Sequence, residues 1–278
     1  MFLSTIKSIF DIDNVGNRWP VRILYLVTVL LNAAIHFNPF ADTDFTPLST
    51  WMDNVYQVTE YDPDTYNALF TTLPLSQGNI IYLLTILAGE LILIASAYIY
   101  AGIYVRNYRK EKLEMLSKTD TVTINYAFTR MPDEPIKVSK FIGRLLLLLL
   151  ITSIVALPLI TISFYMFFFA MIGLPFVFTA PVAYLAGDKG LFSSIPYVAK
   201  MSLRYYFINM RSIAIVLFLA LIIDFTVPYL ANLSTTAYYI VDAALTTWIF
   251  LSFARLAALS YCTMKDFPLK GARRPYAI

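Results

Sequence analysis

The chain contains a single cysteine, Cys262, and a single histidine, His36, in 278 residues. One cysteine excludes an intramolecular disulfide, and one histidine excludes a metal site built from several histidine ligands. The chain also lacks the H-E-x-x-H, G-x-S-x-G and G-x-x-x-x-G-K-[ST] patterns of zinc proteases, serine hydrolases and P-loop ATPases. We therefore expect a protein that is not an enzyme, with no metal, no cofactor and no nucleic-acid partner.

Charged residues are also scarce, at 14% of the chain, whereas 59% of its residues are hydrophobic. A soluble domain usually carries about 25% charged residues, and the mean hydropathy of this chain is +0.66. Several uncharged runs reach the ~20 residues that a helix needs to cross a bilayer. The composition predicts an all-α integral membrane protein, with the lipid bilayer as its first partner.

The charge-poor windows predict six transmembrane helices. Leu145–Gly187 has no Asp, Glu, Lys or Arg, and as one helix it would reach ~60 Å, about twice the ~30 Å hydrocarbon core. We expect two crossings there, with a re-entrant hairpin as the alternative. The predicted spans are 23–39, 79–105, 145–165, 168–187, 212–230 and 237–262, between cytoplasmic segments 1–22 and 263–278.

The loops between these spans alternate in charge. Lys and Arg are concentrated before residue 23, in 106–144, in 189–211 and after residue 264, whereas the Ala41–Gly78 loop has only acidic charges. Because basic loops stay on the cytoplasmic side, we expect both termini in the cytoplasm and a location in the cell (inner) membrane. The arrangement also places the acidic loop outside.

A basic and aromatic segment separates the fourth and fifth predicted spans. Placed on one helix, Tyr197–Arg211 gathers its cations on one side and its aromatic residues on the other. This pattern predicts an amphipathic helix on the inner leaflet, with the cations toward anionic headgroups; a plain basic loop is the alternative. The residues expected at the membrane surface are Lys200, Arg204, Arg211, Tyr205 and Tyr206.

The same region carries a resemblance to a known family. The apolar "FVFTAPVAYLAGDKG" is followed by "LFSSIPYVAKMSLRYYFINM", and together they resemble the membrane domain of bacterial glycerophosphodiester phosphodiesterases over about Pro175–Asp224. The resemblance implies a membrane module and no hydrolysis, since 278 residues filled with spans leave no room for the catalytic barrel. The partial matches are Ser194, Ala199, Ser202 and Phe207.

Ionisable residues inside the spans are the candidates for a ligand or ion path. A charge at the centre of a membrane helix costs on the order of 2.5–3.5 kcal/mol on insertion scales, so it is a functional candidate by default. Glu90, Asp224 and Asp242, with His36 nearby, give the outer half the acidic character that a cation or proton path needs. The alternative is that these acids only bond neighbouring helices. Arg255 is expected to snorkel toward the inner surface.

Two classes of function follow. The first is a non-enzymatic membrane module, namely a scaffold, regulator or accessory subunit, that acts through its basic cytoplasmic faces. The 106–140 loop is its candidate protein-binding surface: Arg106–Lys118 is expected to extend the second span as a helix, and the alternation in Thr121–Phe128 favours a strand, with a flexible linker as the alternative. The second class is a permease-type carrier that binds a cation, proton or small solute in its acidic outer half.

Overall fold

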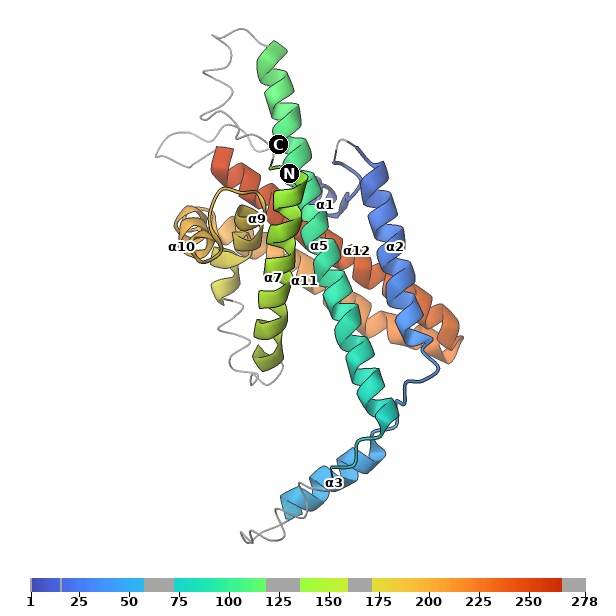
Figure 1. The fold of residues 1–278 in the computed structure, drawn as a ribbon. Coiled ribbons are helices and arrows are strands. Elements are labelled where there is room, and N and C mark those ends of the chain that lie inside the picture. Colours follow the sequence, from blue (N-terminus) through green and yellow to red (C-terminus); the bar gives the residue numbers. More distant parts are fainter. Residues whose placement is uncertain (1, 16, 58–72, 119–135, 160–171, 267–278) are drawn as a thin grey trace.

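The computed structural model describes residues 2–15, 17–57, 73–118, 136–159 and 172–266. Within these ranges every regular element is a helix (Figure 1), as the composition predicts. The elements are α1 (Phe2–Phe10), α2 (Trp19–His36), α3 (Thr46–Gln57), α5 (Gln77–Lys118), α7 (Val138–Leu159), α9 (Ala180–Leu185), α10 (Leu191–Ser202), α11 (Tyr206–Thr226), the 3-10 helix η1 (Val227–Asn232) and α12 (Thr235–Asp266).

Helix α12 is the element around which the others pack. It contacts α5 and α2 most extensively, and α11, η1, α1, α9 and α10 also pack against it. Its C-terminal half is buried almost throughout, and small side chains in it let the neighbouring helices approach closely. These small buried residues are Ser252, Ala254, Ala257 and Ala258.

Four helices of the described chain are long and apolar enough to cross a membrane. They agree with the first, second, fifth and sixth predicted spans, and α5 continues as a charged helix to Lys118, as expected. The predicted strand at Thr121–Phe128 lies outside the described residues. The four candidate spans are Trp19–His36, Gln77–Glu114, Tyr206–Asn232 and Thr235–Asp266.

The predicted fourth span, 168–187, is not one continuous helix. The described chain resumes with an apolar helical stretch, Ile172–Leu185, and this stretch is interrupted by a turn at Phe178–Thr179. Pro181 lies in the first turn of α9, where its missing N–H costs nothing, so it favours the start of a new helix. The sequence alone showed the absence of charge here but not the break.

The segment from α7 to α9 nevertheless begins and ends at the same end of the molecule. Arg144, near the start of α7, donates hydrogen bonds to the carbonyl of Tyr184 in α9 and to that of Lys189 in the turn after α9. Farther along, the Tyr98 and Thr152 hydroxyls lie 3.1 Å apart and join α5 to α7. Helices α7 and α9 therefore both pack beside α5, with the start of α7 next to the end of α9 (Figure 1).

Arg255 of α12 fixes the N-terminal segment. Its guanidinium donates to the carbonyls of Ser8, at 2.5 Å, and Asn14, at 2.7 Å. The Arg255 residue is only 2% exposed, so the expectation that it snorkels to the surface is wrong. Ile9 of α1 is buried against the same helix, and the backbone carbonyls supply the hydrogen bonds that a buried guanidinium needs.

At the opposite end, α3 extends away from the bundle (Figure 1). Asn79, near the start of α5, donates to the carbonyls of Asp42 and Asp44, each at 3.0 Å. The bonds from Thr46 to the Asp44 carboxyl lower the pKa of that carboxyl, which keeps a negative charge at the start of α3, where helix dipoles favour it. We call this end of the bundle the acidic end.

Candidate functional site

Three of the four predicted path residues come close together at the acidic end. Asp242 of α12 lies within electrostatic reach of His36 on α2 and of Asp224 on α11. The His36 ring stacks on Tyr239, with 4.7 Å between the ring centroids. His36 and Asp224 are exposed, and Asp242 is half-buried. The group is thus a surface cluster at the helix ends.

Glu90, the deepest of the predicted path residues, does not join that group. It is exposed on α5 and has no hydrogen bond or ion pair with any described residue. Its neighbour Gly89 is the residue that faces α2, because a side chain there would meet Ile35 and Asn32. Glu90 therefore does not face α2. An ion path between α2 and α5 would need its carboxylate to do so.

The predicted amphipathic helix Tyr197–Arg211 is wrong as a single element. Helix α10 ends at Ser202, a turn follows at 203–205, and α11 begins at Tyr206. Tertiary contacts override the periodicity, because Ser202 is completely buried and its hydroxyl meets the sulfur of Met264 at 3.5 Å. The three cations are therefore divided between α10, the turn and α11.

The cations of that segment and its tyrosines have different surroundings. Lys200, Arg204 and Arg211 are all exposed, as a membrane-facing or partner-facing role requires. Tyr205 is only 8% exposed, so the prediction that it contacts the membrane surface is wrong. Tyr206 is half-buried and donates to the Ile172 carbonyl at 3.2 Å.

A polar group that connects several elements lies at the end opposite to the acidic cluster. Asp188, in the turn between α9 and α10, accepts ion pairs from Arg109 of α5 and Lys265 of α12, each at 2.8 Å. The Tyr261 hydroxyl donates to the same carboxylate oxygen, and Arg109 also donates to the Ala186 carbonyl at 3.0 Å. One carboxylate thus joins three separate elements.

A second buried carboxylate extends this arrangement. Lys112 of α5 pairs with Asp266 of α12 at 2.6 Å, and the Tyr108 hydroxyl donates to Asp266. We call the five charged residues together the ionic cluster, and the end of the bundle that contains it the basic end. Its members are Arg109, Lys112, Asp188, Lys265 and Asp266.

Local structure explains how the ionic cluster forms. Gly187 has a φ of +86°, which glycine adopts without strain, and this bend brings Asp188 back toward α5 and α12. On α5, Arg109 and Lys112 are three residues apart and share a face. The same spacing rule places Tyr261 and Lys265 together on α12.

The sequence contains a weak signal for the ionic cluster, in the form of two isolated acids within basic segments. Asp188 is the only acid in 135–223, and Asp266 is the only acid in 243–278. A lone acid among many cations is a candidate for pairing, but its partners are far away in the chain. Sequence spacing alone therefore identifies the acids and not the cations they meet.

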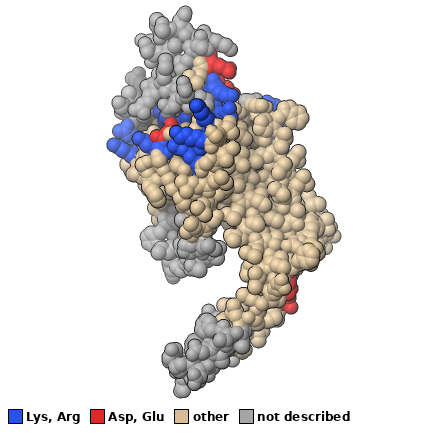
Figure 2. Space-filling model, in the orientation of Figure 1, with Lys and Arg blue, Asp and Glu red and all other residues tan. Residues whose placement is uncertain are grey.

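Charge is distributed unevenly over the surface. On the face shown in Figure 2, Lys and Arg gather at the basic end, above a broad surface with almost no charge. Large apolar side chains are exposed on the long helices, including Leu30 of α2, Leu150 of α7 and Phe218 of α11. An apolar belt of this breadth is typical of surface that faces lipid.

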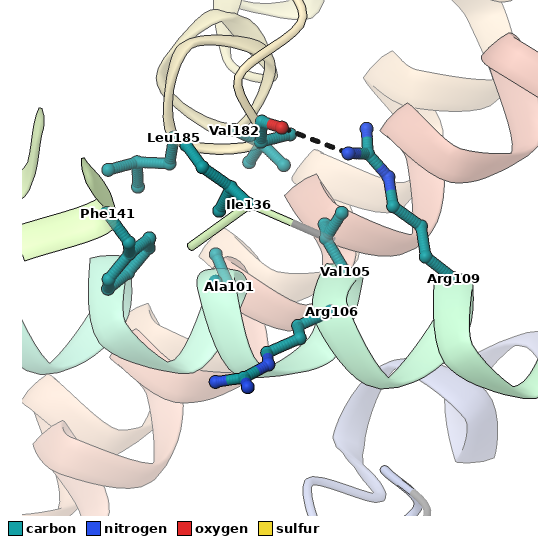
Figure 3. Close-up of a pocket in the computed structure, with 10 residues that line it drawn as sticks. Ala101, Val105, Arg106, Arg109, Ile136, Phe141, Val182 and Leu185 are labelled. Carbon is teal, nitrogen blue, oxygen red and sulfur yellow. Dashed lines mark hydrogen bonds between the residues drawn. The ribbon is translucent and has the colours of Figure 1, made fainter. Parts of the chain in front are cut away.

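A small cleft lies beside the ionic cluster, between α5, α7 and α9 (Figure 3). Arg106 and Arg109 belong to its wall, and its other lining residues are apolar or glycine. Arg109 faces the Ala186 carbonyl across it, along the dashed line in Figure 3. The cleft is therefore an apolar hollow with guanidinium groups at its edge.

No protein-family model, curated protein or solved structure matches this chain. The resemblance to the membrane domain of glycerophosphodiester phosphodiesterases stays a prediction. The features that bear on function are the acidic end and the basic end of the bundle.

We predict that Asp188→Asn destabilises the protein strongly. The change removes the counter-ion of the buried Arg109 and one partner of Lys265, and breaking a buried pair in this way costs about 3–5 kcal/mol. The free energy of unfolding, measured in mixed micelles by titration with a denaturing detergent, should fall accordingly. The control is Asp13→Asn, which removes an acid whose ion pair with Arg22 is largely exposed and should change little. Equal stability of the two variants would show that Asp188 does not hold the basic end together.

Proposed function

We propose that the protein is a non-enzymatic module of the cell membrane, that is, a scaffold, regulator or accessory subunit, acting through its basic end in the cytoplasm. The observation that carries the proposal is the ionic cluster, which holds α5, the α9–α10 turn and α12 in a fixed arrangement beneath the surface of the basic end. Exposed Lys200 and Arg204 extend this surface along α10 and the turn that follows. A fixed basic surface suits recognition of an acidic partner or of anionic headgroups.

In this proposal the chain crosses the membrane six times. The four long apolar helices provide four crossings, and α7 with the interrupted Ile172–Leu185 stretch provides the remaining two as a hairpin. Both termini then lie in the cytoplasm. This orientation is supported by the N-terminal segment, whose Val15 carbonyl accepts a 2.7 Å bond from Asn107 in the basic end of α5.

A permease-type carrier is the second candidate function. It is favoured by the approach of His36, Asp224 and Asp242 to one another at the acidic end. It is disfavoured by Glu90, which lies apart from them on an exposed position of α5. A path through the bilayer would need an ionisable group at that depth facing the others.

The orientation is tested by thiol labelling in a Cys262→Ser background. We predict that a cysteine at Asp53, exposed on α3, reacts with an impermeant maleimide added to intact cells. A cysteine at Ser193, exposed on α10, should react only after permeabilisation. Labelling of Ser193→Cys from outside would contradict both the hairpin and the cytoplasmic basic end.

The choice between module and carrier is tested by ion flux. Purified protein in proteoliposomes, under a potassium diffusion potential and with a pH-sensitive dye inside, should conduct protons no faster than empty vesicles. Sodium uptake should also be no faster than in empty vesicles, whether the vesicle interior is more acidic or more alkaline than the outside. Flux above the empty vesicles that disappears in Glu90→Gln or Asp242→Asn, with Thr85→Val as the control, would replace the module by the carrier.

A further inference from the structure

Helix α10 lies across α5 and α7 instead of along them. In Figure 1 it is seen end-on, whereas α5 and α7 run within the plane of the view. The turn at 203–205 joins it directly to the start of α11, which with η1 is long and apolar enough to cross a membrane. A helix in this position runs along the surface of a bilayer that α5 and α11 cross.

The side chains of α10 form three groups around its axis, at about 100° per residue. The first group faces the bundle and is buried. Beside it on one side are Phe192 and Ile195, which are apolar and are 81% and 49% exposed. Farther round are Ser193 and Lys200, which are polar and exposed. The exposed part of α10 therefore has an apolar side and a polar side. The buried residues of the first group are Ser194, Val198 and Ser202.

The apolar side continues into the chain that follows α10. Leu203 is 64% exposed and still has helical backbone angles, with φ −48° and ψ −41°. It follows Phe192 by about three helical turns, so the two side chains lie on the same side. Phe207, in the first turn of α11, is 82% exposed. The cations Arg204 and Arg211 are exposed in the same stretch.

We propose that α10 lies in the headgroup region of the inner leaflet, with Phe192, Ile195 and Leu203 inserted between the lipids and Lys200 directed toward the phosphates. Helices that lie in a membrane interface have this combination of an apolar face and cations, and the cations are attracted to anionic lipids. This inference names lipid as the partner of this part of the basic end. It rests on the proposed function for the choice of leaflet.

The residues of this surface differ from those that the periodicity of Tyr197–Arg211 predicts. Phe192 precedes that segment, whereas Tyr205, which was expected at the membrane surface, is buried. The contact with lipid is therefore assigned to the exposed apolar residues of α10 and of the turn after it.

Two adjacent residues provide a matched pair for the test. Phe192 and Ser193 are both exposed but lie on different sides of α10, so a bilayer should cover the first and not the second. Each is replaced by cysteine in the full chain, in the Cys262→Ser background, and treated with an impermeant maleimide in opened membranes. We expect Phe192→Cys to react about tenfold more slowly than Ser193→Cys. The two should react equally once the chain is denatured in dodecyl sulfate.

The contribution of charge is tested in opened proteoliposomes. Phe192→Cys should react about threefold more slowly in phosphatidylglycerol than in phosphatidylcholine, because the cations hold α10 against an anionic surface. The double change Lys200→Gln and Arg204→Gln should remove this difference. The control is Lys110→Gln, which removes an exposed cation of α5 outside this segment and should leave the difference unchanged.

Four results would overturn the proposal. Equal labelling of Phe192→Cys and Ser193→Cys in opened membranes would exclude insertion of α10. Equal protection in the two lipids would exclude recognition of anionic headgroups. Protection that is lost when the protein is diluted in lipid would replace the lipid by a second copy of the chain. Protection that occurs in native membranes and not in proteoliposomes would replace it by a protein partner.

These measurements are made on membranes whose two faces are both accessible to the reagent. They are therefore independent of the sidedness of Ser193→Cys and of ion flux, which test the proposed function. Failure of the interfacial position of α10 is thus distinguishable from failure of the orientation or of the module.

Discussion

The carboxylate of Asp188 is the group on which the basic end of this protein depends. Burying a charge is costly unless it is paired and hydrogen-bonded, and here a single carboxylate receives Arg109 from α5 and Lys265 from α12. Neither helix nor the turn after α9 can move independently without separating one of these buried ion pairs. The cleft beside Arg106 inherits its shape from this constraint, because α5 forms one wall and α9 another.

A second polar anchor lies farther along α12. The Arg255 guanidinium donates hydrogen bonds to the backbone carbonyls of Ser8 and Asn14. Its Cζ atom lies 5.3 Å from the centre of the Tyr104 ring. The N-terminal segment is thereby held against α12 in the same way as the α9–α10 turn. Two cations of one central helix, Arg255 and Lys265, thus hold segments that are far apart in the chain, whereas the acids at the other end remain near the surface.

The spans that depend on local composition could be predicted from the sequence, and the features that depend on distant contacts could not. α2, α5, α11 and α12 follow from long uncharged windows. The turn at 203–205 depends on tertiary packing, namely that of Ser202 against Met264. The ionic cluster was missed because its pairs join residues 77 and more positions apart. Glu90 was expected to belong to an ion path because of its depth in the membrane, but depth does not determine which way a side chain faces.

The central claim, that buried ion pairs hold α5 to α12 at the basic end, is tested most directly by a double-mutant cycle on Lys112 and Asp266. The free energy of unfolding is measured for Lys112→Met, Asp266→Asn and the double variant in mixed micelles. Each single change breaks the Lys112–Asp266 ion pair, so the double variant should be more stable than the sum of the two losses predicts, by a coupling energy of about 0.5–3 kcal/mol. Additive losses, with a coupling energy near zero, would contradict the claim.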